Sequence, residues 1–467
     1  MTDQMRTASS VRHLLSSYAT RDRTASEVID SAISILGTDA RERGAVVTVL
    51  EESARRRAKE SDERWSEGVP RALEGVPFGI KDVFDLTGIV TTSGSVVDRD
   101  RTATSTAVAL QRLLDAGAIP VSKDATTEWA VGGPNNLLTG STRNPWDSAR
   151  WAGGSSSGSA ASVALGAFPF ALASDAGGSI RIPASHCGVT GVKTTAGRVP
   201  RTGATPLSWT NETVGPIASS AEDAALMLSV IAGCDATDPQ SFGPGLMMDD
   251  VENSKPLAQL RIGLPGSYFT DDSDQAVLAG YESQLQLLAA QGARFVDVDI
   301  PSARQAHSVG YHVLFTEAWA HHSARRDRFA DYCPVGLRRI ARGSRTTAQQ
   351  YVDMLGFRRA LQAEFADALD QVDFLLMPTT PAAAPALDDL TVDINGRKVP
   401  MYEAQSRATV MCNLSGVPAV TIPSGFTTDG LPVGMQLVGL PYSEELLLGA
   451  AIALQDLTGL KHLTPYS

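Results

Sequence analysis

The stretch between positions 150 and 200 constrains the fold of this chain more than any other. Glycine and serine concentrate in two runs there, residues 153–159 and residues 174–179. Small residues let two backbone segments approach closely and adopt positive φ. The apolar segment Ala160–Ala173 between the runs would pack into a core, so the stretch is not a flexible linker. It predicts a tightly packed site where backbone groups face a ligand.

Length and composition are those of a folded globular protein. The chain has 467 residues, of which 43% are hydrophobic and 20% charged. It is long enough to bury an extensive core without disulfides or structural metals. Its net charge of -12 argues against a nucleic-acid partner and against an anionic membrane, because both attract basic patches.

Targeting signals are also missing from the sequence pattern. No basic segment followed by an apolar run opens the chain, and no stretch approaches 18 uninterrupted apolar residues. We therefore expect a cytoplasmic protein with no membrane span. The four cysteines are far apart and form no C-x-x-C pair, so neither a zinc site nor a disulfide framework is expected.

Apolar periodicity and turn residues predict interleaved helices and strands. Helices are expected over 8–65, 106–117, 219–232, 275–292 and 444–457, and strands over 76–80, 119–121, 260–264, 374–377, 419–423 and 433–438. Such interleaving predicts an α/β fold with a mixed, twisted central β-sheet covered by helices on both faces. Residues 1–70 are expected to form an N-terminal helical wrap around residues 71–467, in a single compact unit.

The histidines do not form a recognisable catalytic pattern. Glu317 and His321 have the i, i+4 spacing of two metal ligands on a helix. A solvated helix face beside Arg325 and Arg326 is the favoured interpretation, so we expect no metal and no cofactor. Gly154–Gly158 formally matches the G-x-S-x-G nucleophile elbow, but the residues before it resemble a loop rather than a strand. We interpret that match as coincidence.

A stronger candidate site combines one lysine with two serines. Ser179 follows a run of small residues whose backbone N–H groups can hold a developing oxyanion. Lys81 follows an apolar strand, where desolvation lowers the pKa of an amine. A neutral lysine can take a proton from a serine hydroxyl directly or through another hydroxyl, such as that of Ser155. A surface lysine and an ordinary or phosphate-binding glycine turn fit the same spacing, and the residues alone leave these alternatives open.

Several linked segments resemble the amidase signature family. They are Gly75–Asp82, Gly153–Ala160, Asp175–Ala184, Cys187–Lys193, Gly215–Ala218 and the region from Gly416 to Leu437. The resemblance extends from about residue 10 to residue 458 and is weakest over 235–370. It implies the fold of that family, with a catalytic domain over residues 71–467.

The resemblance also implies roles for individual residues. Ser179 would be the nucleophile, Ser155 the proton relay and Lys81 the neutral final base. The oxyanion hole would consist of the backbone N–H groups of Ala176, Gly177, Gly178 and Ser179. Gly154, Asp175 and Arg181 would support the site, and the peptide bond between Gly154 and Ser155 is expected to be cis.

The substrate pocket is less sharply defined by the sequence. The candidate lining residues are Trp129, Val131, Gly132, Gly133, Pro134, Asn135, Tyr311, Phe315, Trp319 and Met377–Pro381. These residues favour a neutral, aryl or otherwise apolar acyl group. No basic residue can be assigned to an anionic substrate, although Arg358 and Arg407 are candidates.

Three functional hypotheses follow. The first is an amidase acting on small amides, with hydrazides, carbamates and esters as further substrates. The second is the glutaminase-type component of an amidotransferase complex, which requires a partner protein. The third is a non-catalytic scaffold on the same fold. The small-molecule amide is the expected partner of the first, and a homodimer is left open.

Overall fold

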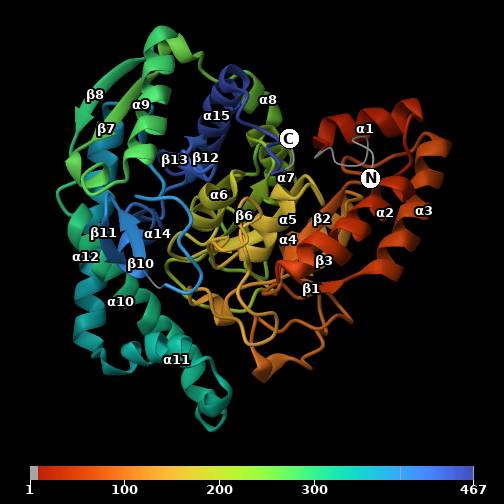
Figure 1. Ribbon diagram of the computed structural model, residues 1–467, viewed down its shortest axis with the longest axis horizontal. Helices are drawn as coiled ribbons and strands as arrows, with labels where there is room; N and C mark the ends of the chain where they lie inside the picture. Colours follow the sequence, from red (N-terminus) through yellow and green to blue (C-terminus); the bar gives the residue numbers. More distant parts are fainter. Residues whose placement is uncertain (1–8, 390, 466–467) are drawn as a thin grey trace.

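An eleven-stranded mixed β-sheet forms the centre of the protein in the computed structural model, which describes residues 9–389 and 391–465 (Figure 1). The strand order is β1-β3-β2-β4-β6-β5-β12-β13-β9-β7-β8. β2 runs parallel to β3 and β4, β7 runs parallel to β8 and β9, and the other neighbours are antiparallel. The sheet strands are β1 Val46–Val49, β2 Pro77–Lys81, β3 Ile119–Asp124, β4 Phe170–Asp175, β5 Thr190–Lys193, β6 Thr213–Ala218, β7 Arg261–Pro265, β8 Arg294–Val298, β9 Phe374–Pro378, β12 Ala419–Phe426 and β13 Pro432–Val438; β10 Thr391–Ile394 and β11 Arg397–Pro400 form a separate hairpin.

Helices cover both faces of this sheet, as the sequence predicts. Neighbouring residues of a strand point to opposite faces. A Cβ at Gly191 would contact Ala184 of α6, whereas the hydroxyl of Thr190 accepts a hydrogen bond from Gln455 of α15. Helices α6 and α15 therefore lie on opposite faces. The helices are α1 Val11–Thr20, α2 Ala25–Ile35, α3 Glu51–Glu67, α4 Val108–Asp115, α5 Ser157–Ala164, α6 Arg181–Cys187, α7 Ala221–Ile231, α8 Met248–Glu252, α9 Gln275–Ala290, α10 Ala303–His322, α11 Pro334–Ile340, α12 Ala348–Asp370, α13 Met401–Ala404, α14 Val410–Ser415 and α15 Glu444–Thr458.

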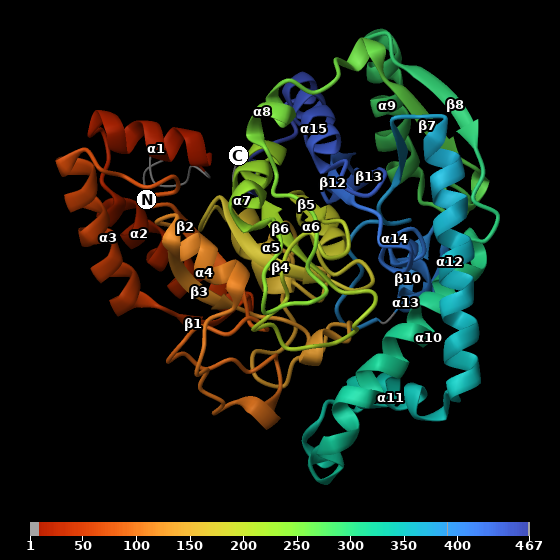
Figure 2. The ribbon, with the colours of Figure 1, turned by 180° about the vertical axis from the view of Figure 1, so that it is seen from behind.

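The N-terminal segment differs in one respect from the prediction. Helices α1, α2 and α3 lie together at one end of the molecule, but Val46–Val49 between them forms β1 and pairs with β3 at the sheet edge (Figure 2). This run consists of valines and a threonine, whose β-branched side chains favour strands. The segment therefore extends the sheet as well as covering it.

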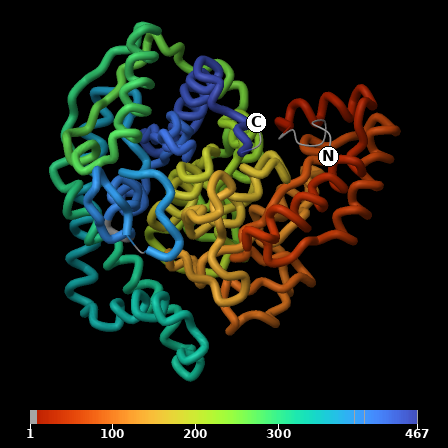
Figure 3. Tube along the Cα trace, in the orientation of Figure 1, coloured from red at the N-terminus to blue at the C-terminus, as the bar shows by residue number. Residues whose placement is uncertain are grey.

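The two ends of the described chain meet at the start of α7 (Figure 3). The backbone N–H of Val11 donates to Asp223 Oδ1 at 2.8 Å. Ser219 Oγ lies 2.9 Å from His462 Nδ1. In the described ranges, every helix is too short or too polar to cross a lipid bilayer.

The sheet brings two polar strand ends to one edge. β2 and β4 are adjacent and parallel, so their carboxyl ends lie at the same edge. β2 ends at Lys81, and β4 ends at Asp175. Helix α5 begins within the first glycine- and serine-rich run, α6 begins just after the second, and the two helices contact each other. This arrangement brings segments that are far apart in the sequence to one site.

Candidate active site

Lys81 is completely buried at the end of β2. Its Nζ lies 2.8 Å from Ser155 Oγ, 3.0 Å from Ser174 Oγ and 3.2 Å from the carbonyl oxygen of Ser174. A neutral amine has two hydrogens and one lone pair. Ser174 can accept both hydrogens, which leaves the lone pair for the hydroxyl hydrogen of Ser155. This role of Ser174 was not expected from the sequence, although Ser174 directly precedes Asp175.

The buried position of Lys81 changes its proton affinity. Burial lowers the pKa of Lys81 to about 7, against the opposing influence of Glu212 and Asp175. Desolvation has this effect because it disfavours the charged form of an amine. A substantial fraction of Lys81 is therefore neutral near pH 7. The alternative of a surface lysine is wrong.

Ser155 lies in the loop that leads into α5. The peptide bond between Gly154 and Ser155 is cis, as expected. The first turn of α5 packs closely against its neighbours, since a Cβ at Gly158 would lie 2.1 Å from the carbonyl oxygen of Ala45. Close packing of this kind requires the glycine, which explains part of the small-residue run.

Ser179 lies in the loop before α6. This loop is next to the loop that carries Ser155. The backbone N–H of Ser156 donates to the carbonyl oxygen of Ser179 at 3.1 Å and joins the two loops. Ser179 lines a cavity and is partly exposed, whereas Ser155 is completely buried. No hydrogen bond joins these two described hydroxyls directly. The geometry brings together Lys81, Ser155 and Ser179, with the accessible hydroxyl on the cavity side.

Asp175 organises the backbone around Ser179. Its Oδ1 accepts a hydrogen bond from the N–H of Gly178 at 2.7 Å, and its Oδ2 accepts one from the N–H of Ile180 at 3.1 Å. The N–H of Gly178 is thus already engaged, which differs from its predicted place in the oxyanion hole. The N–H groups of Ala176, Gly177 and Ser179 have no acceptor among the described residues.

Arg181 holds Asp175 in place. Its Nε lies 3.1 Å from Asp175 Oδ2, and its Nη2 donates to Asn413 Oδ1 at 2.7 Å. Asn413 Nδ2 in turn donates to Asp175 Oδ1 at 2.9 Å. Burial acts to raise the pKa of Asp175, but Arg181 and Asn413 outweigh it and hold that pKa far below its usual range. The carboxylate therefore stays ionised and keeps its backbone donors, which also include the N–H of Arg181 at 3.4 Å.

A small inner cavity of 40 Å³ opens beside Ser179. The predicted residues on its wall are Gly154, Ala176, Gly177, Ser179, Val131, Gly132, Gly133 and Tyr311. The wall also contains residues that were not expected from the sequence, including Trp151, Leu207, Gln405, Ser406 and Arg339. The expectation of a purely apolar pocket without a basic residue is wrong, because Arg339 lies on the wall. Its guanidinium lies against Gly132, where a Cβ would be 3.1 Å from Nη1.

Other predicted pocket residues lie elsewhere. Trp129 is buried in an aromatic cluster with His322 and Tyr332, beneath the guanidinium of Arg325. Trp319 packs against Phe329 and Arg326 rather than the cavity. The i, i+4, i+8 spacing places Tyr311, Phe315 and Trp319 along one helix, but α10 extends past the cavity before it reaches Trp319. Pro134 is not on the wall of the inner cavity, and neither are Arg358 and Arg407.

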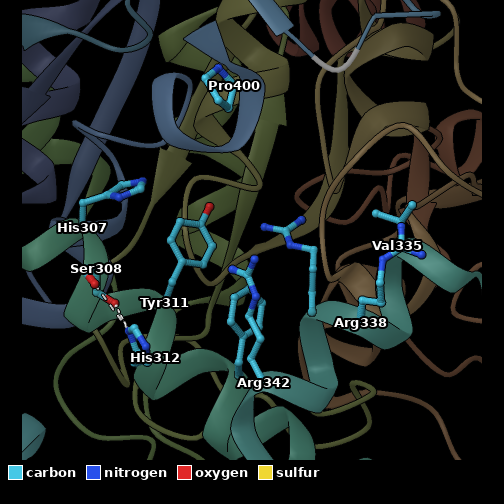
Figure 4. Close-up of a pocket in the computed structure, with 10 residues that line it drawn as sticks. His307, Ser308, Tyr311, His312, Val335, Arg338, Arg342 and Pro400 are labelled. Carbon is cyan, nitrogen blue, oxygen red and sulfur yellow. Dashed lines mark hydrogen bonds between the residues drawn. The ribbon is translucent and has the colours of Figure 1, made fainter.

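An outer cavity of 900 Å³ adjoins the inner one (Figure 4). Tyr311 and Arg339 lie on the walls of both. Phe315 lines the outer cavity, and the Arg339 guanidinium lies 5.3 Å from the centre of its ring. The Tyr311 hydroxyl donates to Ser406 Oγ at 2.8 Å. Tyr311 and Arg339 thus stand between the two spaces.

The helix face around Glu317 is buried, contrary to the interpretation as a solvated face. Glu317 accepts hydrogen bonds from Ser208, Thr210 and Tyr351. His322 is also completely buried. The Glu317 carboxylate is satisfied by the loop 208–210 and by α12, which the spacing along one helix could not reveal. Within the described residues, no group of three or more potential metal ligands is found.

The sequence of this chain matches a known protein family and known proteins over most of its length. Residues 27–448 match the Amidase family model. A component of the glutamyl-tRNA(Gln) amidotransferase of Neisseria gonorrhoeae (strain NCCP11945) is 35% identical over 435 residues, which span 88% of this chain and 89% of that protein. The component of the same name from Coxiella burnetii (strain Dugway 5J108-111) is 35% identical over 429 residues, spanning 86% and 87%.

Solved structures share the fold. One, described as a vestigial protein complex that reveals the evolutionary origins of an s-triazine catabolic enzyme, has a TM-score of 0.92 at 32% identity. The match covers 98% of this chain and 100% of that one. A bacterial aryl acylamidase of the amidase signature family has a TM-score of 0.88 at 25% identity, with 97% of each chain covered.

Proposed function

Because this chain belongs to the amidase signature family, we propose that it hydrolyses the C–N bond of a small amide through an acyl ester on Ser179. Ser179 Oγ attacks the carbonyl carbon while its proton passes through Ser155 Oγ to Lys81 Nζ. The proton then returns along the same route to the leaving amine as the C–N bond breaks. Water hydrolyses the acyl ester by the same proton transfers and regenerates Ser179.

The environment of Lys81 is the observation that carries this proposal. A buried amine whose pKa is near 7 and whose nearest hydroxyl is 2.8 Å away can act as a base at neutral pH. The free N–H groups of Ala176, Gly177 and Ser179 support an oxyanion site, since preorganised donors stabilise developing negative charge. Retention of all these groups argues against the non-catalytic scaffold.

The charge of the inner cavity supports a substrate with a carboxylate. Arg339 lies on its wall, and no aspartate or glutamate is among the described residues that line it. A guanidinium can bind a carboxylate through two parallel hydrogen bonds. Among the described residues, the same wall offers no charge partner for an ammonium group. We therefore propose an amide that carries a carboxylate but no neighbouring ammonium.

A second candidate is the glutaminase half of an amidotransferase. The named relatives in Neisseria and Coxiella favour it, because they match this chain over most of their length. Glutamine also carries a carboxylate that Arg339 could bind. It differs from the first substrate class by its ammonium group, which makes the two candidates separable.

Ammonia release from three matched amides by the purified chain tests both candidates. Glutaramate is glutamine without the ammonium, and valeramide replaces the carboxylate of glutaramate by a methyl group. The first candidate predicts that glutaramate has the highest kcat/KM. Preferential hydrolysis of glutamine would establish the second candidate instead. If the purified chain hydrolyses no amide, including aryl amides, the first candidate is excluded. The scaffold hypothesis and the amidotransferase candidate, which requires a partner protein, then remain.

A further inference from the structure

We propose that the outer cavity binds a second anionic group of the substrate through Arg338 and Arg342. The inference rests on the proposed function and narrows its substrate class. The ligand would be a small molecule with two separated anionic groups, each a carboxylate or a phosphate. One group would lie near Arg339, and the other would occupy the outer cavity.

The walls of the outer cavity are strongly basic. They are formed by α10, by α11, by the short helix Ala341–Arg345 that follows and by the end of β11. Arg338 and Arg342 line the space together with His307 and His312 (Figure 4). Arg339 is a further lining residue. None of the described lining residues is acidic. In a protein with a net charge of -12, this concentration of cations is local and does not reflect overall composition.

Arg338 and Arg342 are not used to stabilise the fold. Both are exposed, and neither forms a hydrogen bond or ion pair with any residue in the described part of the chain. Arg198 provides a contrast, because its guanidinium is paired with Glu444 and Glu445. Uncompensated charges that line a concave space attract anions and increase their rate of association. Arg338 and Arg342 are therefore available to a ligand.

The outer cavity adjoins the site of the proposed chemistry. Tyr311 and Arg339 line both cavities, and a Cβ at Gly177 would lie 3.7 Å from the Tyr311 hydroxyl. A molecule whose amide reaches Ser179 would therefore extend past Tyr311 toward Arg338 and Arg342. A neighbouring space of 660 Å³ shares His312 and Arg342 and adds Arg345, together with one carboxylate, Asp353. The net positive charge of the lining residues is thus lower in this neighbouring space than in the outer cavity.

Binding of inorganic pyrophosphate tests the anion site directly. Isothermal titration calorimetry of the full chain at low ionic strength would measure its Kd. R338Q/R342Q should weaken binding at least about tenfold, because charge-assisted hydrogen bonds to a phosphate are lost. Each single variant should show an intermediate loss. Melting curves should be unchanged, since both side chains are exposed and unbonded.

The matched control is R41Q/R56Q. Arg41 and Arg56 are exposed and lie on the N-terminal segment, and the variant removes the same two charges. It should bind pyrophosphate as the wild type does. Equal weakening in both double variants would overturn the site, because it would reflect net charge alone. Absence of binding to the wild type, or undiminished binding to R338Q/R342Q, would overturn it as well.

Inhibition kinetics decide whether the anion belongs to the substrate. Pyrophosphate should compete with glutaramate in the wild type and should compete at least about tenfold less well in R338Q/R342Q. Binding without competition would overturn the assignment to a substrate group and indicate a separate anion. Calorimetry needs no turnover. A protein that binds pyrophosphate but hydrolyses none of the three amides would therefore retain the anion site and lose the proposed function.

Discussion

Arg181 Nε lies 3.1 Å from Asp175 Oδ2, and both side chains are completely buried. The pair does more than neutralise two buried charges. Asp175 also accepts the N–H groups of Gly178 and Ile180, on either side of Ser179. The ion pair thereby fixes the backbone that presents the proposed nucleophile, and stability and catalysis should depend on it together.

Loss of one member of this pair should be costly for the fold. We expect Arg181→Met to lower the free energy of unfolding by about 3–5 kcal/mol, because it leaves the Asp175 carboxylate buried without its cation. Urea denaturation measures the change. Asp175→Asn/Arg181→Met should recover part of the stability, since neither charge of the pair remains. A single variant as stable as the wild type would contradict the account of the pair.

Removal of any one of the three proposed reacting side chains should abolish most activity. Ser179→Ala, Ser155→Ala and Lys81→Met should each lower kcat by roughly 10³-fold or more, because the groups act as a unit. Steady-state hydrolysis and a thermal melt should be measured on the same samples. Ser162→Ala is the control, since Ser162 lies on α5 and its hydroxyl has no hydrogen-bond partner in the described structure. Full activity in Ser179→Ala would exclude it as the nucleophile.

The pH dependence should follow the deprotonation of Lys81. Burial lowers the pKa of Lys81 to about 7. Since the neutral amine is the active base, kcat/KM should rise with pH through a midpoint near 7 and level off above it. Asp175 remains ionised across this range because its pKa is held far below it. A profile that is flat from pH 5 to pH 8 would exclude Lys81 as the base.

Arg339 should determine the preference for a carboxylate. Arg339→Met should lower kcat/KM for glutaramate by about 10- to 100-fold, which is the loss of a charge-assisted hydrogen bond. The rate with valeramide should change little, because that amide has no carboxylate. The ratio of the two rates is therefore the informative measurement. An equal loss for both amides would assign Arg339 to the structure of the cavity wall.

Two neighbouring glycines should differ in their tolerance of a side chain. Gly178 has a φ of 124°, and a Cβ there would lie 2.4 Å from Thr409 Oγ1. At Gly177 the nearest atoms would be 3.7 Å away, which is ordinary contact. Gly178→Ala should therefore lower the Tm by several degrees, whereas Gly177→Ala should melt like the wild type. A similar Tm for both variants would contradict the steric argument.

The sequence by itself determined the α/β class and brought Lys81, Ser155 and Ser179 under consideration. These features can be recognised in short stretches of sequence, because apolar runs indicate strands and small residues indicate backbone segments that approach closely. The cis peptide before Ser155 was expected from the resemblance to the amidase signature family. One local prediction was wrong, because Val46–Val49 lies between helices but forms an edge strand.

Only the tertiary structure decided what lines the cavities. Arg339 reaches the inner cavity from α11, and Trp129, which is close in sequence to residues of the wall, is buried in an aromatic cluster instead. The tertiary structure also decided the role of Gly178, because its N–H group donates a hydrogen bond to Asp175. Spacing along a chain fixes which residues share a helix face or a strand. It does not fix which distant segments meet, because that depends on the packing of the whole sheet and its helices.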